Sequence, residues 1–486
     1  MIDRREILDM ATRMSLNPDV VEKDYVLGWM LAGINAHDEL RDSWVFKGGT
    51  CLKKCFFETY RFSEDLDFTL RDGVQIEDGF LQRVFGKIGE WIYENTGIEI
   101  PPEAIAFDIY TNPRGSISCQ GKLAYRGPLR AGGGGVRGLP RVKLDLTADE
   151  HLVLAPVAAP VFHPYTDTPD GGIQITAYAY EEVFGEKVRA LAERTRPRDL
   201  YDVINLFRHM DALPAPEVLL DVVAQKCRFK GRAAPVLTDF DPHREELANL
   251  WENMLAHQLP MLPPYEQYWD ELPAFFGWLG GGALPRMPAA FVMGAGETVL
   301  RERILNLPAS PAIQSMIEIV RFAAANRLLV ELDYDGTTRR IEPYSLRRTR
   351  DGNIVLHAYN VESAGHRSYR IDRMRGARAT NQSFVPRYEI ELSPQGAVRI
   401  ADTVRKASTS LAFPASSTRQ RRPASPFAAP RQKAAKPFGQ ATYVYQCPIC
   451  QKKFRRDRMN GQLNAHKNDW GGQCSGRNGF LVDTKY

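Results

Sequence analysis

Apolar residues in the first half of the chain follow two different spacings. Residues 1–45 and 80–93 place them at roughly helical intervals, which predicts helices in both segments. Residues 104–147 have the spacing of strands, with a break at the four consecutive glycines 132–135. Within them, 141–147 alternates polar and apolar side chains, as a half-buried strand does. Helices and strands that alternate in this way predict an α/β fold.

Helical spacing returns in the second half, where residues 214–285 are rich in Leu, Trp and Phe and are expected to pack on the preceding unit. Residues 311–400 then predict one helix followed by several strands, with a turn at Asp335-Gly336. Pro, Ala, Ser and basic residues dominate the stretch after them, as in disordered linkers. The chain is therefore expected to contain a first unit, a linker, a second unit, a basic linker and a terminal unit: 1–285, 286–310, 311–400, 401–442 and 443–486.

Length and composition limit the class of protein. With 486 residues the chain exceeds what one hydrophobic core usually serves, so several domains are expected. No run of about 18 apolar residues occurs, so we expect no membrane span. The N-terminus lacks the apolar segment of a signal peptide, which favours a cytoplasmic location.

Charge is distributed unevenly along the chain. Residues 403–486 hold 16 Lys and Arg against three Asp, a net charge of +13. Because the whole chain has a net charge of +4, the preceding residues carry −9. A basic arm on an acidic body is typical of proteins that contact nucleic acid, so DNA or RNA is the expected partner of this arm.

Two short motifs in the first half indicate phosphoryl chemistry. Gly48 and Gly49 let the backbone approach a phosphate without a side chain in the way, and the hydroxyl of Thr50 can donate to a phosphate oxygen. Asp65 and Asp67 stand two apart on a predicted strand and therefore point to the same face. Paired carboxylates suit Mg²⁺, which is usually held by one or two carboxylates and substrate phosphates. The alternative is a surface turn followed by a solvated acidic strand end.

Further charged residues extend this candidate site. Asp145, on the alternating strand, is a candidate third carboxylate that would complete a metal site and accept the proton of an attacking hydroxyl. A surface aspartate on an amphipathic strand is the alternative. The segment 187–202 is dense in charge, with Lys187, Asp199 and Asp202, and fits a wall that binds a triphosphate. A helix–helix turn with several salt bridges would have the same composition.

Four motifs follow one another in the first half. They are Phe-Lys-Gly-Gly-Thr (46–50), Arg-Phe-Ser-Glu-Asp-Leu-Asp-Phe (61–68), Val-Lys-Leu-Asp-Leu (142–146) and Glu-Lys-Val-Arg-Ala-Leu followed by Arg-Pro-Arg-Asp-Leu-Tyr-Asp (186–202). Through them, residues 1–210 resemble the AbiEii/AbiGii toxin family, nucleotidyltransferases of the polymerase-β superfamily. The resemblance implies a nucleotidyltransferase fold with a helical extension, an NTP substrate and Mg²⁺. It also implies a toxin of a phage-defence or toxin–antitoxin system.

The same resemblance implies roles for individual residues. Gly49 and Thr50, with Thr where family members often have Ser, would hold the β- and γ-phosphates. Lys187 would contact a phosphate, and Asp199 would occupy the last acidic motif of the family, with Asp202 as a second candidate for that place. Some relatives add nucleotides to tRNA 3′ ends, so RNA, and tRNA in particular, is an expected acceptor. A separate antitoxin protein is an expected partner.

Residues 311–400 carry a second resemblance. Ile-Glu-Pro (341–343) and Arg-Ser-Tyr-Arg-Ile-Asp-Arg-Met (367–374) resemble the WYL domain, an SH3-like β-barrel module of bacterial regulators and defence proteins. The Trp-Tyr-Leu that gives the domain its name is replaced by Ile-Val-Leu at 354–356. By resemblance, Tyr359, Arg370 and Arg373 would bind an anionic ligand such as a nucleotide or a nucleic-acid end. A structural role on a solvated, alternating strand is equally open.

The terminal unit has the ligand spacing of a zinc site. Cys447 and Cys450 are separated by two residues, His466 follows after 15 more, and Cys474 after another seven. Two cysteines in a knuckle with a later His and Cys supply four ligands for a tetrahedral structural Zn²⁺. Three independent cysteines beside a solvated histidine are the alternative. Apolar residues at 454 and 463 fit the small core of a ββα finger.

Two functions of different classes are consistent with these features. The first is a Mg²⁺-dependent nucleotidyltransferase that moves an NMP from an NTP to RNA or to a protein hydroxyl, with a WYL-like sensing domain and a zinc finger. The second is a nucleic-acid-binding regulator whose transferase fold is an inactive platform. Only the first requires Asp65 and Asp67 for activity.

Overall fold

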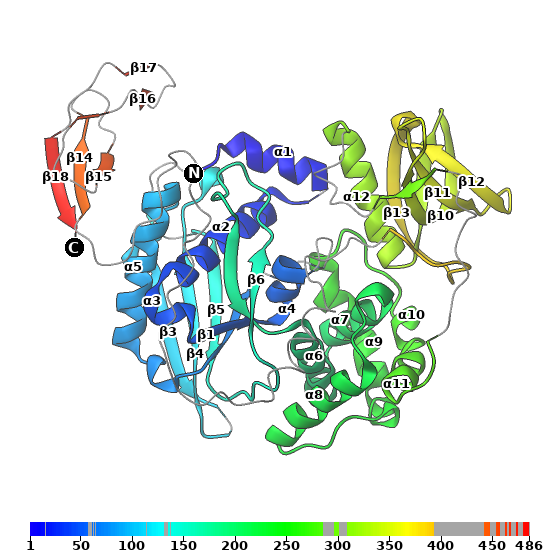
Figure 1. The fold of residues 1–486 in the computed structure, drawn as a ribbon, viewed down its shortest axis with the longest axis horizontal. Coiled ribbons are helices and arrows are strands. Elements are labelled where there is room, and N and C mark those ends of the chain that lie inside the picture. The colour runs from blue at the N-terminus through cyan, green and yellow to red at the C-terminus, as the bar shows by residue number, and fades with distance from the viewer. Residues whose placement is uncertain are drawn as a thin grey trace.

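The computed structural model describes most of residues 1–392 and short segments of the terminal unit (Figure 1). Up to residue 441 it does not describe 15, 57–60, 62, 64, 113, 131–134, 137, 285–295, 301–308 and 393–441. From residue 442 on it describes 442–447, 453–456, 462–463, 466–467, 473–474 and 480–485. Within these described segments, the search for a helix long and apolar enough to cross a membrane finds none.

A seven-stranded mixed sheet lies at the centre of the first unit, in the strand order β3-β4-β5-β2-β1-β7-β6. β2 is parallel to β5 and β1 is parallel to β7, whereas the other neighbours are antiparallel. The strands are β1 (Trp44–Lys47), β2 (Asp65–Leu70), β3 (Ile105–Thr111), β4 (Ile117–Ala124), β5 (Arg141–Thr147), β6 (Val157–Val161) and β7 (Ile173–Ala177). The strand predicted at 141–147 is confirmed as β5, and Asp65 and Asp67 lie on a strand as expected.

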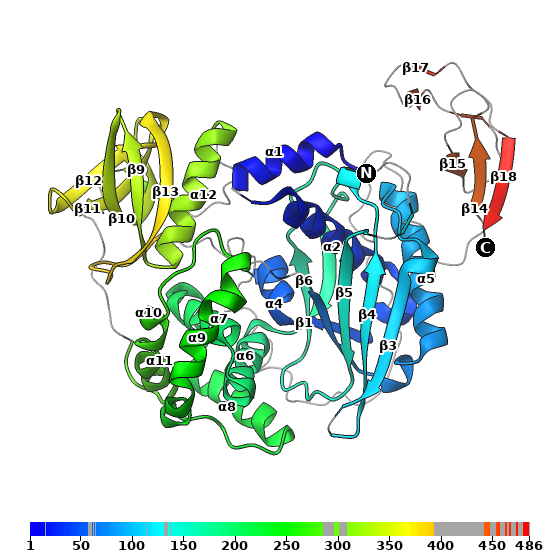
Figure 2. The ribbon, with the colours of Figure 1, turned by 180° about the vertical axis from the view of Figure 1, so that it is seen from behind.

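The two faces of this sheet differ in character. On one face, Trp44 and Phe68 are fully buried, and Trp44 packs against Phe85 of helix α5 (Asp78–Thr96). Helix α2 (Pro18–Ala36) lies beside α5, in front of the strands in Figure 1 and behind them in Figure 2. Because strand residues alternate between faces, the polar members of β2 and β5 point the other way. The opposite face is therefore free to hold a polar site.

Helices dominate the rest of the first unit. They are α1 (Arg4–Met14), α3 (Asp38–Arg41), α4 (Gly48–Cys51), α6 (Tyr180–Arg194), α7 (Pro197–Arg208), α8 (Pro216–Phe229), α9 (Arg244–Leu255), α10 (Glu266–Trp269) and α11 (Leu272–Leu279), and α4 continues into a π-helical turn at Leu52–Phe56. Pro197 and Pro216 each stand in the first turn of a helix, where the missing N–H has no intrahelical partner to lose. The charge-dense segment 187–202 spans the end of α6 and the start of α7, with Lys187 on α6 and Asp199 and Asp202 on α7.

The second unit is a helix followed by a second sheet. Helix α12 (Pro311–Ala325) precedes β9 (Leu328–Tyr334), β10 (Thr337–Arg348), β11 (Ile354–Asn360), β12 (Gly365–Arg370) and β13 (Met374–Ser383). These strands pair antiparallel in the order β12-β11-β10-β9-β13, and the short β8 (Thr298–Val299) pairs with β10. The predicted turn forms at Asp335 and Gly336, both with positive φ, as tight hairpins require. The SH3-like barrel implied by the sequence stays a prediction.

The turn between α12 and β9 joins the second unit to the first. The side-chain oxygen of Asn326 accepts hydrogen bonds from the hydroxyls of Tyr201 on α7, at 2.9 Å, and Tyr268 on α10, at 2.7 Å. Next to it, Arg327 lies 2.7 Å from the carboxylate of Glu271. These contacts hold α7 directly against the second unit.

The described segments of the terminal unit are strands. β14 (Thr442–Gln446) pairs with β15 (Lys453–Arg456) and β18 (Phe480–Lys485), and β16 (His466–Lys467) pairs with β17 (Gln473–Cys474). The helix of a ββα finger is not confirmed by these segments. The basic linker predicted at 401–442 lies, except for its last residue, outside the described residues.

Candidate active site

Three candidate carboxylates lie on the polar face of the first sheet. Asp67 of β2 is the cross-strand partner of Asp145 of β5, and Asp65 is the partner of Lys143. Since residues two apart on a strand point to the same face, all three carboxylates share it. The structure therefore brings together residues from two separate sequence motifs, as the sequence suggested.

The same row of cross-strand partners continues on both sides, through Lys47 of β1 and Gln120 of β4. Burial and the charge of Asp145 raise the pKa of Asp67 to about 7, against the opposing effect of Lys47. Burial and the charge of Asp65 likewise raise the pKa of Asp145. The carboxylates therefore repel one another, and a cation placed among them would relieve that repulsion.

The glycine turn packs directly against this group. Gly48 follows β1 with φ of +80°, in the left-handed region that favours glycine. A Cβ on Gly48 would lie 2.1 Å from Oδ2 of Asp67, and a Cβ on Gly49 would lie 3.0 Å from Oγ of Ser63. The backbone of Gly48 thus touches the Asp67 carboxylate. A side chain there would collide with it.

Thr50 makes a contact that the sequence did not predict. Its side chain is fully buried, and its hydroxyl donates to the backbone carbonyl oxygen of Asp65 at 2.5 Å. In this structure the hydroxyl therefore fastens the glycine turn to the strand that carries the carboxylates. Contact between Thr50 and a phosphate stays a prediction.

Lys187 belongs to a buried cluster with Asp202. The Asp202 carboxylate accepts hydrogen bonds from Nε and Nη2 of Arg61, at 2.7 and 2.8 Å, and its Oδ2 lies 2.8 Å from Nζ of Lys187. Burial works to raise the pKa of Asp202, but Arg61 and Lys187 outweigh it and hold that pKa below its usual range. A Cβ on Gly49 would lie 3.2 Å from Nη2 of Arg61, so this cluster borders the glycine turn. The cluster is therefore part of the same site.

Asp199 stands in a separate pair. Its carboxylate is fully buried and accepts two hydrogen bonds from Arg194, at 2.7 and 2.8 Å, while Arg194 remains about half exposed. Of the two candidates that the sequence left open, Asp202 is the one in contact with Lys187 and Arg61. Position in the chain does not show this, because both residues lie on the same helix.

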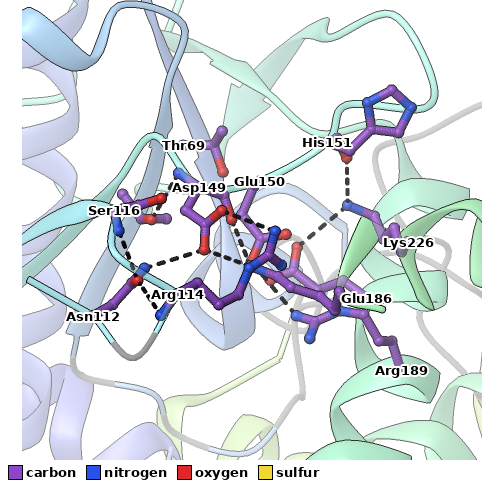
Figure 3. Close-up of polar contacts among 12 residues, drawn as sticks. Thr69, Asn112, Arg114, Ser116, Asp149, Glu150, His151, Glu186, Arg189 and Lys226 are labelled. Carbon is purple, nitrogen blue, oxygen red and sulfur yellow. Dashed lines mark hydrogen bonds and ion pairs between the residues drawn. The ribbon is translucent and has the colours of Figure 1, made fainter. Parts of the chain in front are cut away.

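Sequence reasoning missed a buried charge cluster on the helical side of the site. Nζ of Lys47 lies 3.1 Å from Oε1 of Glu186 on α6 and 3.8 Å from Oε1 of Glu150, which follows β5. Arg189 of α6 and Lys226 of α8 reach the same acids, and Figure 3 shows these side chains pointing toward one another. Lys47 and Glu186 each directly precede a residue of the predicted site, which was the available signal. Their partners come from distant segments that no spacing reveals.

Comparison with protein families places this site in a known group. The family described as "Nucleotidyl transferase AbiEii toxin, Type IV TA system" matches residues 29–275, about half of the chain. The chain belongs to the AbiEii family. Its first unit is thus a nucleotidyltransferase domain of toxin type, and the candidate carboxylates and the glycine turn lie within the matched region. The WYL domain matches residues 315–379, in the second unit.

Solved structures resemble this AbiEii-family chain only weakly. MenT4, a nucleotidyltransferase toxin from Mycobacterium tuberculosis H37Rv, covers 58% of this chain and 90% of its own length, with 17% identity and a TM-score of 0.36. Proteasome accessory factor B/C of Arthrobacter aurescens covers 81% of this chain and 74% of its own, with 13% identity and a TM-score of 0.15. Both scores are too low to establish a shared overall fold. Comparison with curated proteins finds no match.

In the WYL domain of this AbiEii-family protein, the three predicted ligand residues lie apart. Arg370 pairs with the neighbouring Asp372, at 3.1 and 2.7 Å, and Arg373 lies 3.7 Å from Asp335, all on the surface. Tyr359 stands at the other end of the β11–β12 ladder from Arg370, with a guanidinium group 4.5 Å above its ring. A common pocket formed by these three residues stays a prediction.

The buried arginine of the WYL domain was not predicted. Arg347 on β10 is fully buried, donates to Oγ of Ser345 at 3.0 Å, and lies 3.0 Å from Glu391 and 3.4 Å from Glu297. An arginine with several partners in the interior of a domain is held in place by them. It contributes to this fold rather than to the exposed face that carries Arg370.

Two of the proposed zinc ligands are close together. The Sγ atoms of Cys447 and Cys474 lie 3.8 Å apart, both side chains are buried, and Leu463 and Phe454 pack with them. In the backbone, His466 is the cross-strand partner of Cys474. Cys450 lies outside the described residues. Within those residues, a search for three or more His, Cys, Asp or Glu side chains that could hold a metal ion finds no such group.

Proposed function

We propose that this protein transfers a nucleoside monophosphate from an NTP to a hydroxyl group of RNA, with tRNA as the first candidate acceptor. The observation that carries the proposal is the grouping of Asp65, Asp67 and Asp145 on one face of the sheet, with Gly48 packed against Asp67. Membership of a nucleotidyltransferase family supports the reaction class. A protein hydroxyl is the alternative acceptor.

Mg²⁺ suits the donors that stand in this site. Asp65 and Asp67 offer hard carboxylate oxygens, and the raised pKa values of Asp67 and Asp145 reflect crowded negative charge. We infer that Asp65 and Asp67 would hold the ion, with substrate phosphates completing its ligands. When bound, Mg²⁺ supplies a Lewis acid that neutralises charge on the phosphate being transferred.

The chain's own residues would orient the two reactants. Gly48 and Gly49 would let the triphosphate approach the carboxylates, because neither carries a side chain. Lys187 would contact a phosphate from its place beside Asp202, which takes the role of the last acidic motif. The acceptor hydroxyl would attack the α-phosphorus, its proton would pass to Asp145, and the bond to pyrophosphate would break. Lys47, the cross-strand partner of Asp67, would hold the Asp67 carboxylate in place by charge attraction.

The rest of the chain would control this reaction. Two thiolates on one tetrahedral Zn²⁺, with Zn–S distances of about 2.3 Å, lie about 3.8 Å apart. The observed Cys447–Cys474 distance of 3.8 Å therefore supports a structural zinc site completed by Cys450 and His466. The basic arm around it would contact RNA or DNA, and the WYL domain would bind an anionic ligand. Because the family is a type IV toxin–antitoxin family, we also propose an antitoxin partner.

The test is a label-transfer assay with the full chain. Protein, Mg²⁺ and total tRNA would be incubated with each NTP in turn, labelled with ³²P at either the α- or the γ-phosphate. Nucleotidyl transfer predicts that only α-label reaches an acceptor, and that Asp65→Asn/Asp67→Asn abolishes it. Label on the protein itself would identify a protein acceptor. Absence of transfer with every NTP, together with retained nucleic-acid binding, would favour the regulator with an inactive transferase platform.

A further inference from the structure

Lys47, Asp67, Asp145 and Gln120 form a row across four strands, here called the carboxylate row. The Gln120 end of this row lies on a part of the sheet that no helix covers (Figure 2). On β4, Gln120 stands opposite Asp145 and Lys122 stands opposite Lys143, and Arg141 lies two residues from Lys143 on β5. All these side chains point to the face that carries the carboxylates. In Figure 2, β3, β4 and β5 face the viewer and no helix crosses over them. Gln120, Lys122, Arg141 and Lys143 are exposed.

The positive charges on this surface are poorly compensated. Lys122 and Lys143 are direct cross-strand partners, and like charges directly opposite each other destabilise a sheet. Lys143 has one distant ion pair, 3.9 Å to Asp65. Within the described residues, the side chains of Lys122 and Arg141 make no hydrogen bond or ion pair. Three cations in a stripe beside the active site form a binding surface for an anion.

An exposed aromatic ring lies on the same face of the sheet, on the other side of Gln120 from this stripe. Tyr110 of β3 is 43% exposed, although a tyrosine usually buries most of its ring. Tyr110 is the cross-strand partner of Ser118, two residues before Gln120, so its side chain points to the face that carries Asp145. Burial and the charge of Asp145 raise the pKa of its hydroxyl. Exposed aromatic rings beside cations are the usual platform for single-stranded nucleic acid, because every base has a face that can stack.

We propose that Tyr110, Gln120, Lys122, Arg141 and Lys143 form an acceptor face that binds the single-stranded end of a nucleic-acid acceptor. Gln120 and Lys47 occupy opposite ends of the carboxylate row, and the glycine turn lies at the Lys47 end. The NTP therefore approaches from β1, and the acceptor approaches from β4. The cations bind backbone phosphates, Tyr110 stacks on a base, and the terminal hydroxyl points at Asp145. This inference rests on the proposed transfer reaction and identifies its acceptor.

The first arm of the test is kinetic. Tyr110→Ala and Lys122→Ala are each expected to raise the KM for RNA about tenfold, which corresponds to the loss of one stacking or phosphate contact. The KM for the NTP should stay unchanged. Tyr93→Ala and Lys87→Ala, on α5 at the other face of the sheet, are the matched controls and should leave both constants unchanged. An unchanged KM for RNA in the two test variants would overturn the acceptor face.

The second arm does not depend on catalysis. A single-stranded RNA with a photoreactive 4-thiouridine at its 3′ end would be crosslinked to the full-length Asp67→Asn protein, and the modified peptide would be mapped. A crosslink in 105–124 supports the acceptor face even if the wild-type protein transfers no label, in which case only the proposed reaction fails. Crosslinks confined to the basic arm at 403–486 would overturn it. Transfer of label to a protein acceptor, together with no RNA crosslink in 105–124, would also overturn it.

Discussion

The two largest sheets of the described residues present charged side chains in opposite ways. In the nucleotidyltransferase domain, Asp65, Asp67 and Asp145 lie close together, because the parallel register of β2 and β5 places Asp67 directly beside Asp145. In the WYL domain, Arg370 pairs with its near neighbour Asp372 on the surface, and Tyr359 stands at the far end of the same strand ladder. Alternation along a strand places residues on a face. Only the register between strands decides whether they meet.

Burial makes a second difference between the two regions. The side chains of Asp202, Arg61 and Lys187 are almost completely buried. Removing one of them would therefore leave a buried charge that neither a partner nor water can compensate. Arg370 and Asp372 are largely exposed, and water would replace either partner. The same pairing of Arg with Asp should therefore have very different consequences when it is broken.

The largest effect is expected at the carboxylates. Asp65→Asn/Asp67→Asn should lower the rate of label transfer by about 10²–10⁴-fold or more, the scale of a lost catalytic group. Because the substitution relieves repulsion between carboxylates, the melting temperature should not fall. Transfer assays and thermal unfolding on the same preparations would check both statements. A variant that unfolds would not test the site, and Asp65→Asn alone would then replace it.

Next in size is the loss of the buried acid of α7. Asp202→Asn should destabilise the protein by about 3–5 kcal/mol, because Arg61 and Lys187 would be left buried without a counter-charge. Asp199→Asn is the matched control, and its effect should be smaller because Arg194 is half exposed. Urea unfolding of both variants would measure the difference. Equal losses would contradict the distinction between the two acids.

The stabilisation by Asp202 should also depend on pH. Its pKa is lowered in the folded protein, so the folded state favours the ionised form, and the stabilisation is fully present above the ordinary aspartate pKa. It is lost as the pH falls through the lowered value. The difference in unfolding free energy between wild type and Asp202→Asn should therefore be largest near pH 7 and shrink below about pH 4. A difference that stays constant into strong acid would argue against this ion cluster.

A smaller but more local effect is expected at the glycine turn. Gly48→Ala combines left-handed backbone strain of about 1–2 kcal/mol with a collision at Asp67, so transfer should fall at least about tenfold. Gly231→Ala has similar strain, with φ of +69°, but nothing near the added methyl group. It should lose similar stability and keep full activity. Equal activity in the two variants would show that the contact between Gly48 and Asp67 is unimportant.

The smallest effect is expected on the exposed face of the WYL domain. Arg370→Ala should change the melting temperature by no more than about 2 °C, since exposed ion pairs contribute little. Arg347→Ala, in the interior of the same domain, should lower it much more, because Glu297 and Glu391 would lose their partner. Differential scanning calorimetry would compare them. A large shift for Arg370→Ala would show that the exposed Arg370–Asp372 pair stabilises the domain, contrary to this prediction.

The sequence predicted local features of the fold and of the site better than contacts between distant segments. The placement of Asp65 and Asp67 on one face follows from two-residue periodicity, and the turn at Asp335-Gly336 follows from residue type. The choice between Asp199 and Asp202 depends on which arginine each one meets in space. The cluster of Lys47 with Glu150 and Glu186 depends on packing between the sheet and two helices. Such contacts join distant segments, and no spacing along one chain encodes them.

The most direct test of the central claim is to locate the metal and the nucleotide together. Crystals grown with Mn²⁺ in place of Mg²⁺ and a non-hydrolysable NTP analogue would show the ion by its anomalous scattering. We expect a Mn²⁺ peak in contact with Asp65 and Asp67, with the triphosphate against the backbone of Gly48 and Gly49. An ion and nucleotide bound elsewhere, with these carboxylates untouched, would contradict it.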